Sequence, residues 1–206
     1  RVISKREREM VAYHEAGHAL VAHLLPHADA VHRISIVSRG QALGFTLTPP
    51  EQDKYQHTRS ELMAQMAVLL GGRIAEDHFF QELTGGAAYD IERVTRVARA
   101  MVLYYGMSKL GPLNFGPQHE TSDYGRSIYE PHRISDKLQA EVDAELQRLV
   151  QEAEAVAKDI ITNNTKQMDA VVEKLLEVET LEAEEFEKVV GLPKAKRPLD
   201  NNGLAA

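Results

Sequence analysis

Apolar residues recur every three or four positions along most of the chain, and this spacing predicts a mainly α-helical fold. The first helix is expected over residues 4–25, where Ser4 and Glu7 have the spacing of a capping box and Pro26 ends the element. Five further helices are expected, one beginning after Thr58 and the others over residues 90–104, 134–160, 168–178 and 182–190.

Three stretches depart from regular helical spacing. Residues 31–48 alternate between apolar and polar side chains, which predicts a β-hairpin with its turn at residues 38–42. Residues 106–133 show only weak periodicity, and we expect a long loop that is functional, mobile or an interface arm. Within the second helix, Gly71-Gly72 interrupts the apolar pattern, although apolar residues continue beyond it.

Two of the expected helices have an apolar stripe that predicts their inward faces. In the helix over residues 90–104 the stripe is Ile91, Val94, Val97, Ala98, Met101 and Val102. In the helix over residues 134–160 it is Leu138, Val142, Leu146, Leu149, Ala153, Val156 and Ile160. We expect one domain, with a catalytic part over residues 1–133, a C-terminal helical part over residues 134–191 packed on it, and a disordered tail over residues 192–206.

Composition narrows the classes of protein that need to be considered. The 206 residues carry 24 Lys and Arg against 31 Asp and Glu, a net charge of −7 that disfavours a nucleic-acid partner. The excess of negative charge lies in residues 134–190, where 15 acidic and 6 basic residues give −9 and leave +2 for the rest of the chain, as on the solvated face of a helical bundle. The absence of Cys excludes disulfides and thiolate metal sites. No run of about 18 apolar residues occurs, so we expect a soluble domain.

The motif HEAGH at residues 14–18 lies within the first expected helix. Residues four apart project from the same face of a helix, so His14 and His18 can both bind one metal ion. Glu15 lies one step round the helix and can act on a water molecule without binding the metal. The alternative is that both histidines are polar residues of an amphipathic helix. Three others are interpreted as surface or core histidines: His23, His27 and His32.

A catalytic zinc site needs a third protein ligand and an open fourth position. The longer motif H-E-x-x-H-x-x-G-x-x-H is excluded, because Val21 and Leu24 stand where it requires Gly and His. Candidates later in the chain are Glu76, Asp77, His78 and Asp90. Asp90 follows a Gly-Gly turn at the start of a helix, so it is either the ligand or a plain helix N-cap. Glu76 could equally be a surface carboxylate.

Four motifs in the same order resemble the protease domain of the FtsH-type ATP-dependent zinc metalloproteases, a family of membrane-anchored AAA proteases. They are VAYHEAGHA at residues 11–19, RGQALGFT at 39–46, LLGGRIAE at 69–76 and TGGAAYDIE at 84–92. The resemblance covers roughly residues 8–117, and the acidic helical half is similar to the C-terminal part of that family. Two departures are Tyr89, where the family usually has a small polar residue, and Ser38, where proline is usual.

The resemblance implies a role for each matching residue. His14 and His18 correspond to the two histidine ligands of one Zn²⁺ per chain, and Glu15 corresponds to the catalytic glutamate. Asp90 corresponds to the aspartate that completes the zinc site. Glu76 matches a nearby acidic position, which we expect to lie beside the site and to orient a histidine.

The resemblance also implies an architecture and an activity. The fold would be a helical metalloprotease domain with a small β-hairpin or sheet near the active-site helix and a C-terminal helical bundle. The activity would be zinc-dependent endopeptidase cleavage of unfolded, translocated or membrane proteins. The hairpin either adds an extended peptide to an exposed edge or only covers the core.

The same resemblance implies a larger machine for protein quality control. Its protomers form a homo-hexamer, and an ATPase domain and a membrane anchor precede the protease domain in the parent chain. This chain begins at Arg1 without Met or a signal-peptide pattern and has no G-x-x-x-x-G-K-[ST] loop, so we expect a fragment without the ATPase. The domain would face the cytoplasm, matrix or stroma. Two other classes stay open: a structural zinc-binding helical domain without catalysis, and a metal-free helical interaction module.

Overall fold

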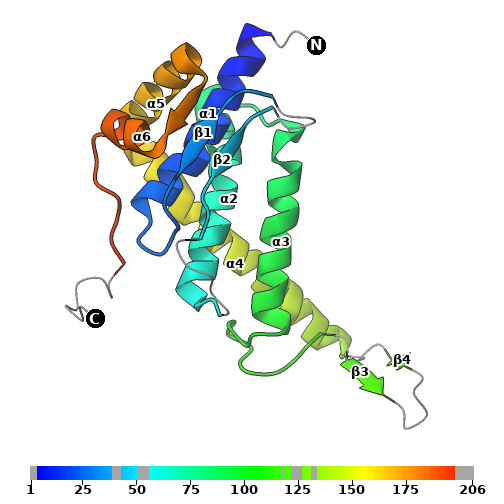
Figure 1. The fold of residues 1–206 in the computed structure, drawn as a ribbon. Coiled ribbons are helices and arrows are strands. Elements are labelled where there is room, and N and C mark those ends of the chain that lie inside the picture. The colour runs from blue at the N-terminus through cyan, green and yellow to red at the C-terminus, as the bar shows by residue number, and fades with distance from the viewer. Residues whose placement is uncertain are drawn as a thin grey trace, which may run out of the picture.

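The computed structural model describes residues 4–38, 43–50, 56–116, 118–121, 127–130 and 134–197. Helices make up most of these residues, which confirms the mainly α fold (Figure 1). The helices are α1 (Lys5–Leu24), α2 (Arg59–Phe80), α3 (Ala88–Leu103), α4 (Asp136–Asn163), α5 (Thr165–Val178) and α6 (Ala183–Val190), with a 3₁₀ turn, η1, at Gly85–Ala87. The strands are β1 (Arg33–Ser35), β2 (Phe45–Leu47), β3 (Gln118–Thr121), β4 (Ser127–Glu130) and β5 (Thr180–Glu182).

Helix α1 begins at the predicted capping box. The Ser4 hydroxyl accepts a hydrogen bond from the Glu7 N–H, and the Glu7 carboxylate accepts one from the Ser4 N–H. Helix α2 has the same arrangement between Thr58 and Glu61. Both helices therefore start where the sequence places them.

Helices α1 and α2 cross with their backbones in contact, because each has a glycine at the crossing. A Cβ on Gly17 would lie 2.4 Å from the carbonyl oxygen of Gly71, and a Cβ on Gly71 would lie 2.7 Å from that of Gly17. Helix α2 runs without a break through Gly71-Gly72, so the pair does not interrupt it. The packing against α1 offsets the roughly 1 kcal/mol that each glycine costs in a helix.

The predicted hairpin is confirmed as β1 and β2, but it forms part of a three-stranded antiparallel sheet in the order β2-β1-β5. Strand β5 was not expected, because three residues between two helices carry too little alternation to be recognised. It pairs Leu181 with Ile34, and both side chains are buried. Strand β1 is therefore central and β2 is an edge strand. The turn residues 39–42 lie outside the described residues.

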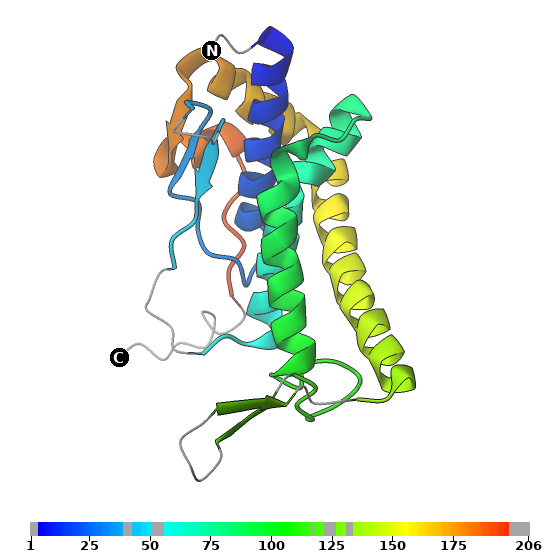
Figure 2. The same cartoon turned by 90° about the vertical axis from the view of Figure 1, so that its right-hand side faces the viewer.

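Helix α4 packs along α2 and α3 and crosses behind them (Figures 1 and 2). Its expected stripe is correct near Val142 and Leu149, but Val156 is 39% exposed. Ala157 and Ile161 take the inward positions instead. An α-helix has 3.6 residues per turn, so a stripe assembled from steps of three and four residues drifts away from the buried face along a long helix. In α3, Ile91 likewise faces outward, with 42% exposure.

The connection expected to be a long loop over residues 106–133 contains the antiparallel pair β3–β4, in which Gln118 pairs with Glu130 and Thr121 with Ser127. The long connection therefore contains two paired strands that its weak periodicity did not predict. The two strands lie beyond the ends of α3 and α4, away from the sheet (Figure 1). Residues 117, 122–126 and 131–133 lie outside the described residues.

The segment after α6 runs back along the end of α1. The Ala195 N–H donates to the His23 carbonyl at 3.0 Å, and the Lys194 ammonium donates to the Leu25 carbonyl at 2.8 Å. The His23 ring is buried, donates from Nε2 to the Leu192 carbonyl and meets Phe186 edge-on. His23 is thus a core histidine. The expected tail is described as far as residue 197.

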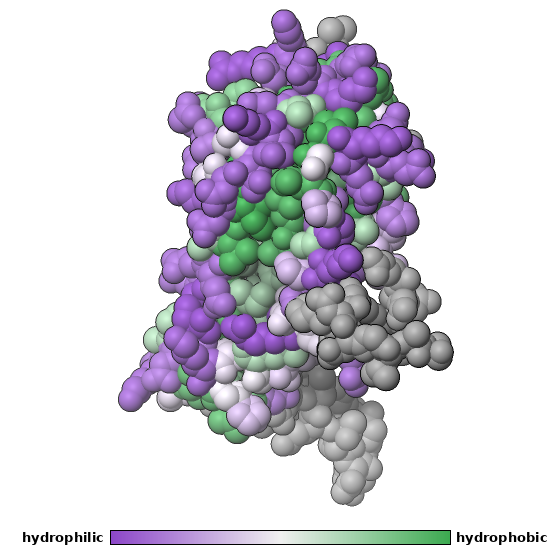
Figure 3. Space-filling model, turned by 90° about the vertical axis from the view of Figure 1, so that its left-hand side faces the viewer, coloured by the Kyte–Doolittle hydropathy of each residue, from purple (hydrophilic) through white to green (hydrophobic). Residues whose placement is uncertain are grey.

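The surface seen from the left of Figure 1 shows an apolar area at mid-height, bordered by hydrophilic side chains (Figure 3). Contiguous apolar surface of this kind is typical of interaction sites. Among the described helices, none combines the length and the apolar character needed to cross a bilayer.

Candidate active site

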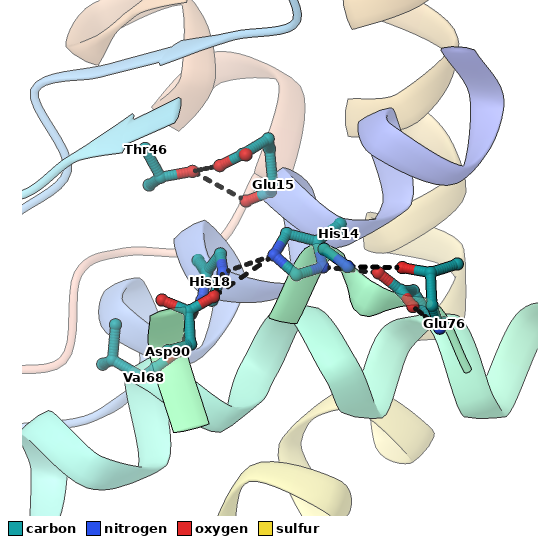
Figure 4. Close-up of polar contacts among 9 residues, drawn as sticks. His14, Glu15, His18, Thr46, Val68, Glu76 and Asp90 are labelled. Atoms are coloured by element: carbon teal, nitrogen blue, oxygen red, sulfur yellow. Dashed lines mark hydrogen bonds and ion pairs between the residues drawn. The ribbon is translucent and has the colours of Figure 1, made fainter. Parts of the chain in front are cut away.

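His14 and His18 lie one turn apart on α1 and point toward Asp90 (Figure 4). Their Nε2 atoms are 3.0 Å apart, and Asp90 Oδ2 lies 3.4 Å from each of them. Among the described residues, these three form the only group of His, Cys, Asp or Glu side chains close enough together to hold a metal ion. The sequence named all three as candidates, and the fold brings them together.

The spacing of the three atoms fits a zinc ion. Ligand atoms placed tetrahedrally at about 2.1 Å from zinc lie about 3.4 Å from one another, close to the distances in this cluster. Each Nδ1 is already used: that of His14 donates to Glu76 Oε1, and that of His18 donates to the Val68 carbonyl, both at 2.7 Å. Because these acceptors fix the tautomers, each ring, when neutral, directs the Nε2 lone pair at the other ring, an arrangement that a cation between them stabilises.

Asp90 reaches the cluster because a short turn ends beside α1. Thr84 caps this turn, accepting the Gly86 N–H on its hydroxyl at 3.1 Å. Asp90 is the third residue of α3, and the N-cap position is Ala87. The alternative of a plain N-cap for Asp90 is therefore not met, and its carboxylate is directed at the two histidines.

Glu76 lies on the far side of His14 from Asp90 (Figure 4). Only 3% of Glu76 is exposed. Its second carboxylate oxygen accepts the backbone N–H of Thr84 at 2.9 Å, so both oxygens are engaged away from the three ligand atoms. The neighbouring candidates Asp77 and His78 are exposed on the outer face of α2 and do not join the cluster.

The carboxylates make the cluster strongly attractive to positive charge. Burial opposes ionisation of Asp90, but hydrogen bonds from His14 and His18 outweigh it and hold its pKa well below its ordinary value. Burial also lowers the pKa of His14, yet hydrogen bonds to Asp90 and Glu76 outweigh it and raise this pKa to about 9. For Glu76, burial is outweighed by hydrogen bonds from His14 and Thr84, which lower its pKa. A divalent cation supplies the charge that this field favours.

Two contacts at the cluster were missed by sequence reasoning. A Cβ on Gly72 would lie 2.6 Å from Nε2 of both His14 and His18, so only glycine lets α2 pass this close to the rings. The Val68 carbonyl that orients His18 is a main-chain group. Because every residue has one, the amino-acid sequence carries no signal for this contact. The Gly71-Gly72 pair was the one available signal, and its meaning depends on the helix crossing.

The chain matches the model of a known protein family. A family profile described as peptidase family M41 matches residues 1–189. The chain belongs to peptidase family M41. The resemblance drawn from the four motifs is thereby confirmed, and zinc is the cofactor that family membership implies.

Several curated relatives of this M41 chain carry the name ATP-dependent zinc metalloprotease FtsH. The protein from Pseudothermotoga lettingae is 48% identical over 208 residues, which cover 100% of this chain and 33% of the relative. That from Rubrobacter xylanophilus is 46% identical over 192 residues, covering 92% and 29%. The chain therefore spans about a third of the length of these relatives.

The M41 cluster opens into a cleft of about 1040 Å³ between α1, β2, α2 and the start of α3. This volume is at the upper end of the roughly 300–1,000 Å³ typical of small-molecule sites, and the open cleft has room for extended chain. Tyr89, the departure from the family pattern noted above, is 65% exposed at its rim, with the Arg93 guanidinium 5.8 Å from its ring centre. Tyr89 therefore lies at the mouth of the cleft and outside the cluster of His14, His18 and Asp90.

Glu15 lines the same cleft and is 7% exposed. Its carboxylate accepts a hydrogen bond from the Thr46 hydroxyl at 2.7 Å and lies outside the ligand cluster (Figure 4). Sequence reasoning placed Thr46 in a family motif and gave it no role. Its alternation with Phe45 and Leu47 showed only that it faces the opposite side of the strand.

Proposed function

We propose that this chain is a zinc-dependent endopeptidase in which His14, His18 and Asp90 hold the metal and Glu15 is the general base. One observation carries the proposal: three ligand atoms converge at zinc-like spacing while the other nitrogen of each histidine is already hydrogen-bonded. Glu15 stands beside this cluster, in the open cleft, without belonging to it.

The side chains have separate tasks in peptide hydrolysis. Zinc bound at this site supplies Lewis acidity, which polarises a peptide carbonyl and makes water a better nucleophile. Glu15 takes the proton from the attacking water and delivers it to the departing amine nitrogen. Glu76 holds the His14 ring in the tautomer that directs Nε2 to the metal, as a hydrogen-bonded carboxylate commonly does for a ligating histidine.

The edge strand β2 borders the cleft and supports a mode of substrate binding. Its outer edge is not paired with another described strand, so an extended peptide can add to it through main-chain hydrogen bonds. Such binding tolerates many side chains, as a protease of unfolded or membrane proteins requires.

Three variants test the assigned roles. Glu15→Gln should keep zinc and lose most peptide hydrolysis, since the carboxylate acts on water and not on the metal. Asp90→Ala should lose most of the bound zinc, whereas Glu76→Ala should weaken zinc binding less, by about 10–100-fold. Zinc content and the cleavage of casein are measured for each variant. Loss of zinc from Glu15→Gln would show that its role is wrong, and an empty site in Glu76→Ala with a full one in Asp90→Ala would exchange those two assignments.

Matched controls separate these effects from general damage. Asp77→Ala removes an exposed carboxylate next to Glu76 on the same helix and should keep both zinc and activity. Glu9→Gln removes a half-buried carboxylate of α1 and should likewise keep both zinc and activity. A structural zinc domain is the second candidate. It would need a fourth protein ligand, and the described residues bring only three together. Zinc that stays bound in an inactive wild-type chain would favour that alternative, and a chain without metal affinity would favour a helical interaction module.

The whole protein is a further part of the proposal. The names of the relatives support an ATPase domain in the same parent chain, and we propose a homo-hexamer anchored in a membrane with this part on the cytoplasmic, matrix or stromal side. The apolar area in Figure 3 supports self-association.

This chain should cut unfolded proteins without a response to ATP and should leave stably folded proteins intact. Only monomers in sedimentation at high concentration would contradict the assembly, and degradation of a stable folded protein by this chain would contradict the dependence on an ATPase.

A further inference from the structure

We propose that Thr46 is a positioning residue for Glu15, so that the edge strand bordering the cleft also holds the catalytic carboxylate in place. The inference rests on the proposed function, because it assigns Glu15 the role of general base. It adds a residue of the β-sheet to a site that is otherwise built on helices.

The hydrogen bond is direct and sheltered. The Thr46 hydroxyl lies 2.7 Å from Glu15 Oε2 and 3.0 Å from the Glu15 carbonyl oxygen. Within the described parts of the chain, no other donor reaches the Glu15 carboxylate. Both of these Glu15 oxygens can only accept, so the single hydroxyl proton is shared between them, and the shorter distance gives the stronger bond to the carboxylate, which restricts its rotation. The second oxygen, Oε1, is left to receive a proton from water.

A second contact shows that β2 is fitted closely to Glu15. A Cβ on Gly44 would lie 3.0 Å from Glu15 Cγ and 2.9 Å from Val11 Cγ1. Gly44 immediately precedes β2, and both Gly44 and Thr46 approach Glu15. Glycine at the first position allows the backbone to approach α1, and threonine at the second places a hydroxyl on the carboxylate. The two residues together fix the distance between β2 and the base.

The position of Thr46 in the sheet connects this contact to substrate. Thr46 pairs with Ile34 of β1, so the main chain of β2 is ordered on one side by the sheet. The other side is the edge at which we propose that a peptide adds. A peptide that aligns on this edge is therefore aligned on the same strand that holds Glu15. A general base acts from within hydrogen-bond reach, about 2.6–3.2 Å, or through one water molecule, so a shared support for base and substrate improves their mutual geometry.

A purely structural role is the competing explanation, since the same hydroxyl also contacts the backbone of α1. The two explanations differ in what a hydroxyl deletion changes. A structural tie affects stability, whereas a positioning contact affects the rate of the chemical step with little effect on substrate binding.

The test compares Thr46→Val, which keeps the shape and removes the hydroxyl, with Thr46→Ser, which keeps the hydroxyl. The zinc-loaded protein is assayed for zinc content, thermal midpoint, kcat and KM with a flexible fluorogenic peptide. Thr46→Val should keep zinc and KM and lose about 10–100-fold in kcat, the range typical of residues that orient a catalytic group. Thr46→Ser should recover kcat to within about threefold of wild type.

Thr180→Val is the matched control. Thr180 lies in the same sheet, and its hydroxyl is 2.9 Å from the Ser35 hydroxyl, away from the cleft. The Thr180→Val variant loses a hydrogen bond of similar length that does not involve Glu15, so its kcat should stay at the wild-type value. An equal loss of kcat in Thr46→Val and Thr180→Val would assign both effects to the sheet and overturn the proposal.

A double variant separates this inference from the function on which it rests. In a Glu15→Gln background, Thr46→Val should cause no further loss, because the group that it positions is gone. A further loss as large as in the wild-type background would show that Thr46 does not act through Glu15. If Glu15→Gln itself retains full activity, the proposed function fails. If Glu15→Gln is inactive while Thr46→Val is fully active, only the role of Thr46 fails.

Discussion

The close passage of α2 behind the two histidines makes Gly72→Ala a sharp test of the metal site. The new Cβ would lie 2.6 Å from Nε2 of both His14 and His18. Non-bonded heavy atoms normally stay about 3.5 Å apart, so the rings must retreat by about 0.9 Å. Metal–ligand distances tolerate only about 0.2 Å. The substitution therefore removes the geometry needed for zinc while leaving all three ligands in the chain.

The same substitution should have a small effect on the metal-free fold. Alanine is favoured over glycine in a helix by about 1 kcal/mol. Turning two rings off their preferred rotamers costs about 0.5–1.5 kcal/mol each, so the two effects nearly cancel. We expect the free energy of unfolding of the metal-free protein to change by no more than about 2 kcal/mol, and zinc affinity to fall by at least about 100-fold.

Chelator competition measures the zinc affinity, and thermal unfolding with and without zinc measures the stability. Gly85→Ala is the control, because a Cβ at that position meets no atom within 4 Å. It should bind zinc as the wild type does, and its thermal midpoint should rise on zinc addition to the same extent. Wild-type zinc affinity in Gly72→Ala would refute the reasoning, since the rings could not then lie against α2 as described.

Three further predictions concern stability, measured by chemical denaturation. Gly17→Ala should destabilise the protein by about 1–3 kcal/mol, because its Cβ meets the Gly71 carbonyl, which cannot turn away. Phe186→Ala should cost about 3–5 kcal/mol, because the ring is fully buried. Hydrogen bonds from Arg148 lower the pKa of Glu145, so its contribution is present above its ordinary pKa of 4.5 and is lost as pH falls. Glu145→Gln should therefore cost about 1–2 kcal/mol at neutral pH and less in acid.

Local patterns in the sequence determined the helices and half of the site. The capping boxes at Ser4 and Thr58 place the starts of α1 and α2, because the bonds of a cap join residues only three positions apart. The pair His14 and His18 is equally local, since four residues make about one helical turn. The alternation around Ile34 predicted the hairpin for the same reason. Each of these features depends only on neighbours along the chain.

The remaining half of the site was decided by contacts between distant segments. The sequence left Asp90 open between helix cap and metal ligand, and its carboxylate lies beside His14 and His18 only because α3 begins next to α1. Thr46 contacts Glu15 only because the fold places β2 against α1. In α4, Val156 lies outside the buried face because the helices packed against α4 decide which of its residues are buried.

The crossing of α1 and α2 is the clearest case of this division. From the sequence, Gly71-Gly72 interrupts an apolar pattern; in the fold it lets two backbones touch and brings α2 against the histidine rings. Sequence alone thus determined which groups could do chemistry. The tertiary structure decided which of them meet, because a close approach depends on the shapes of two surfaces that are far apart in the chain.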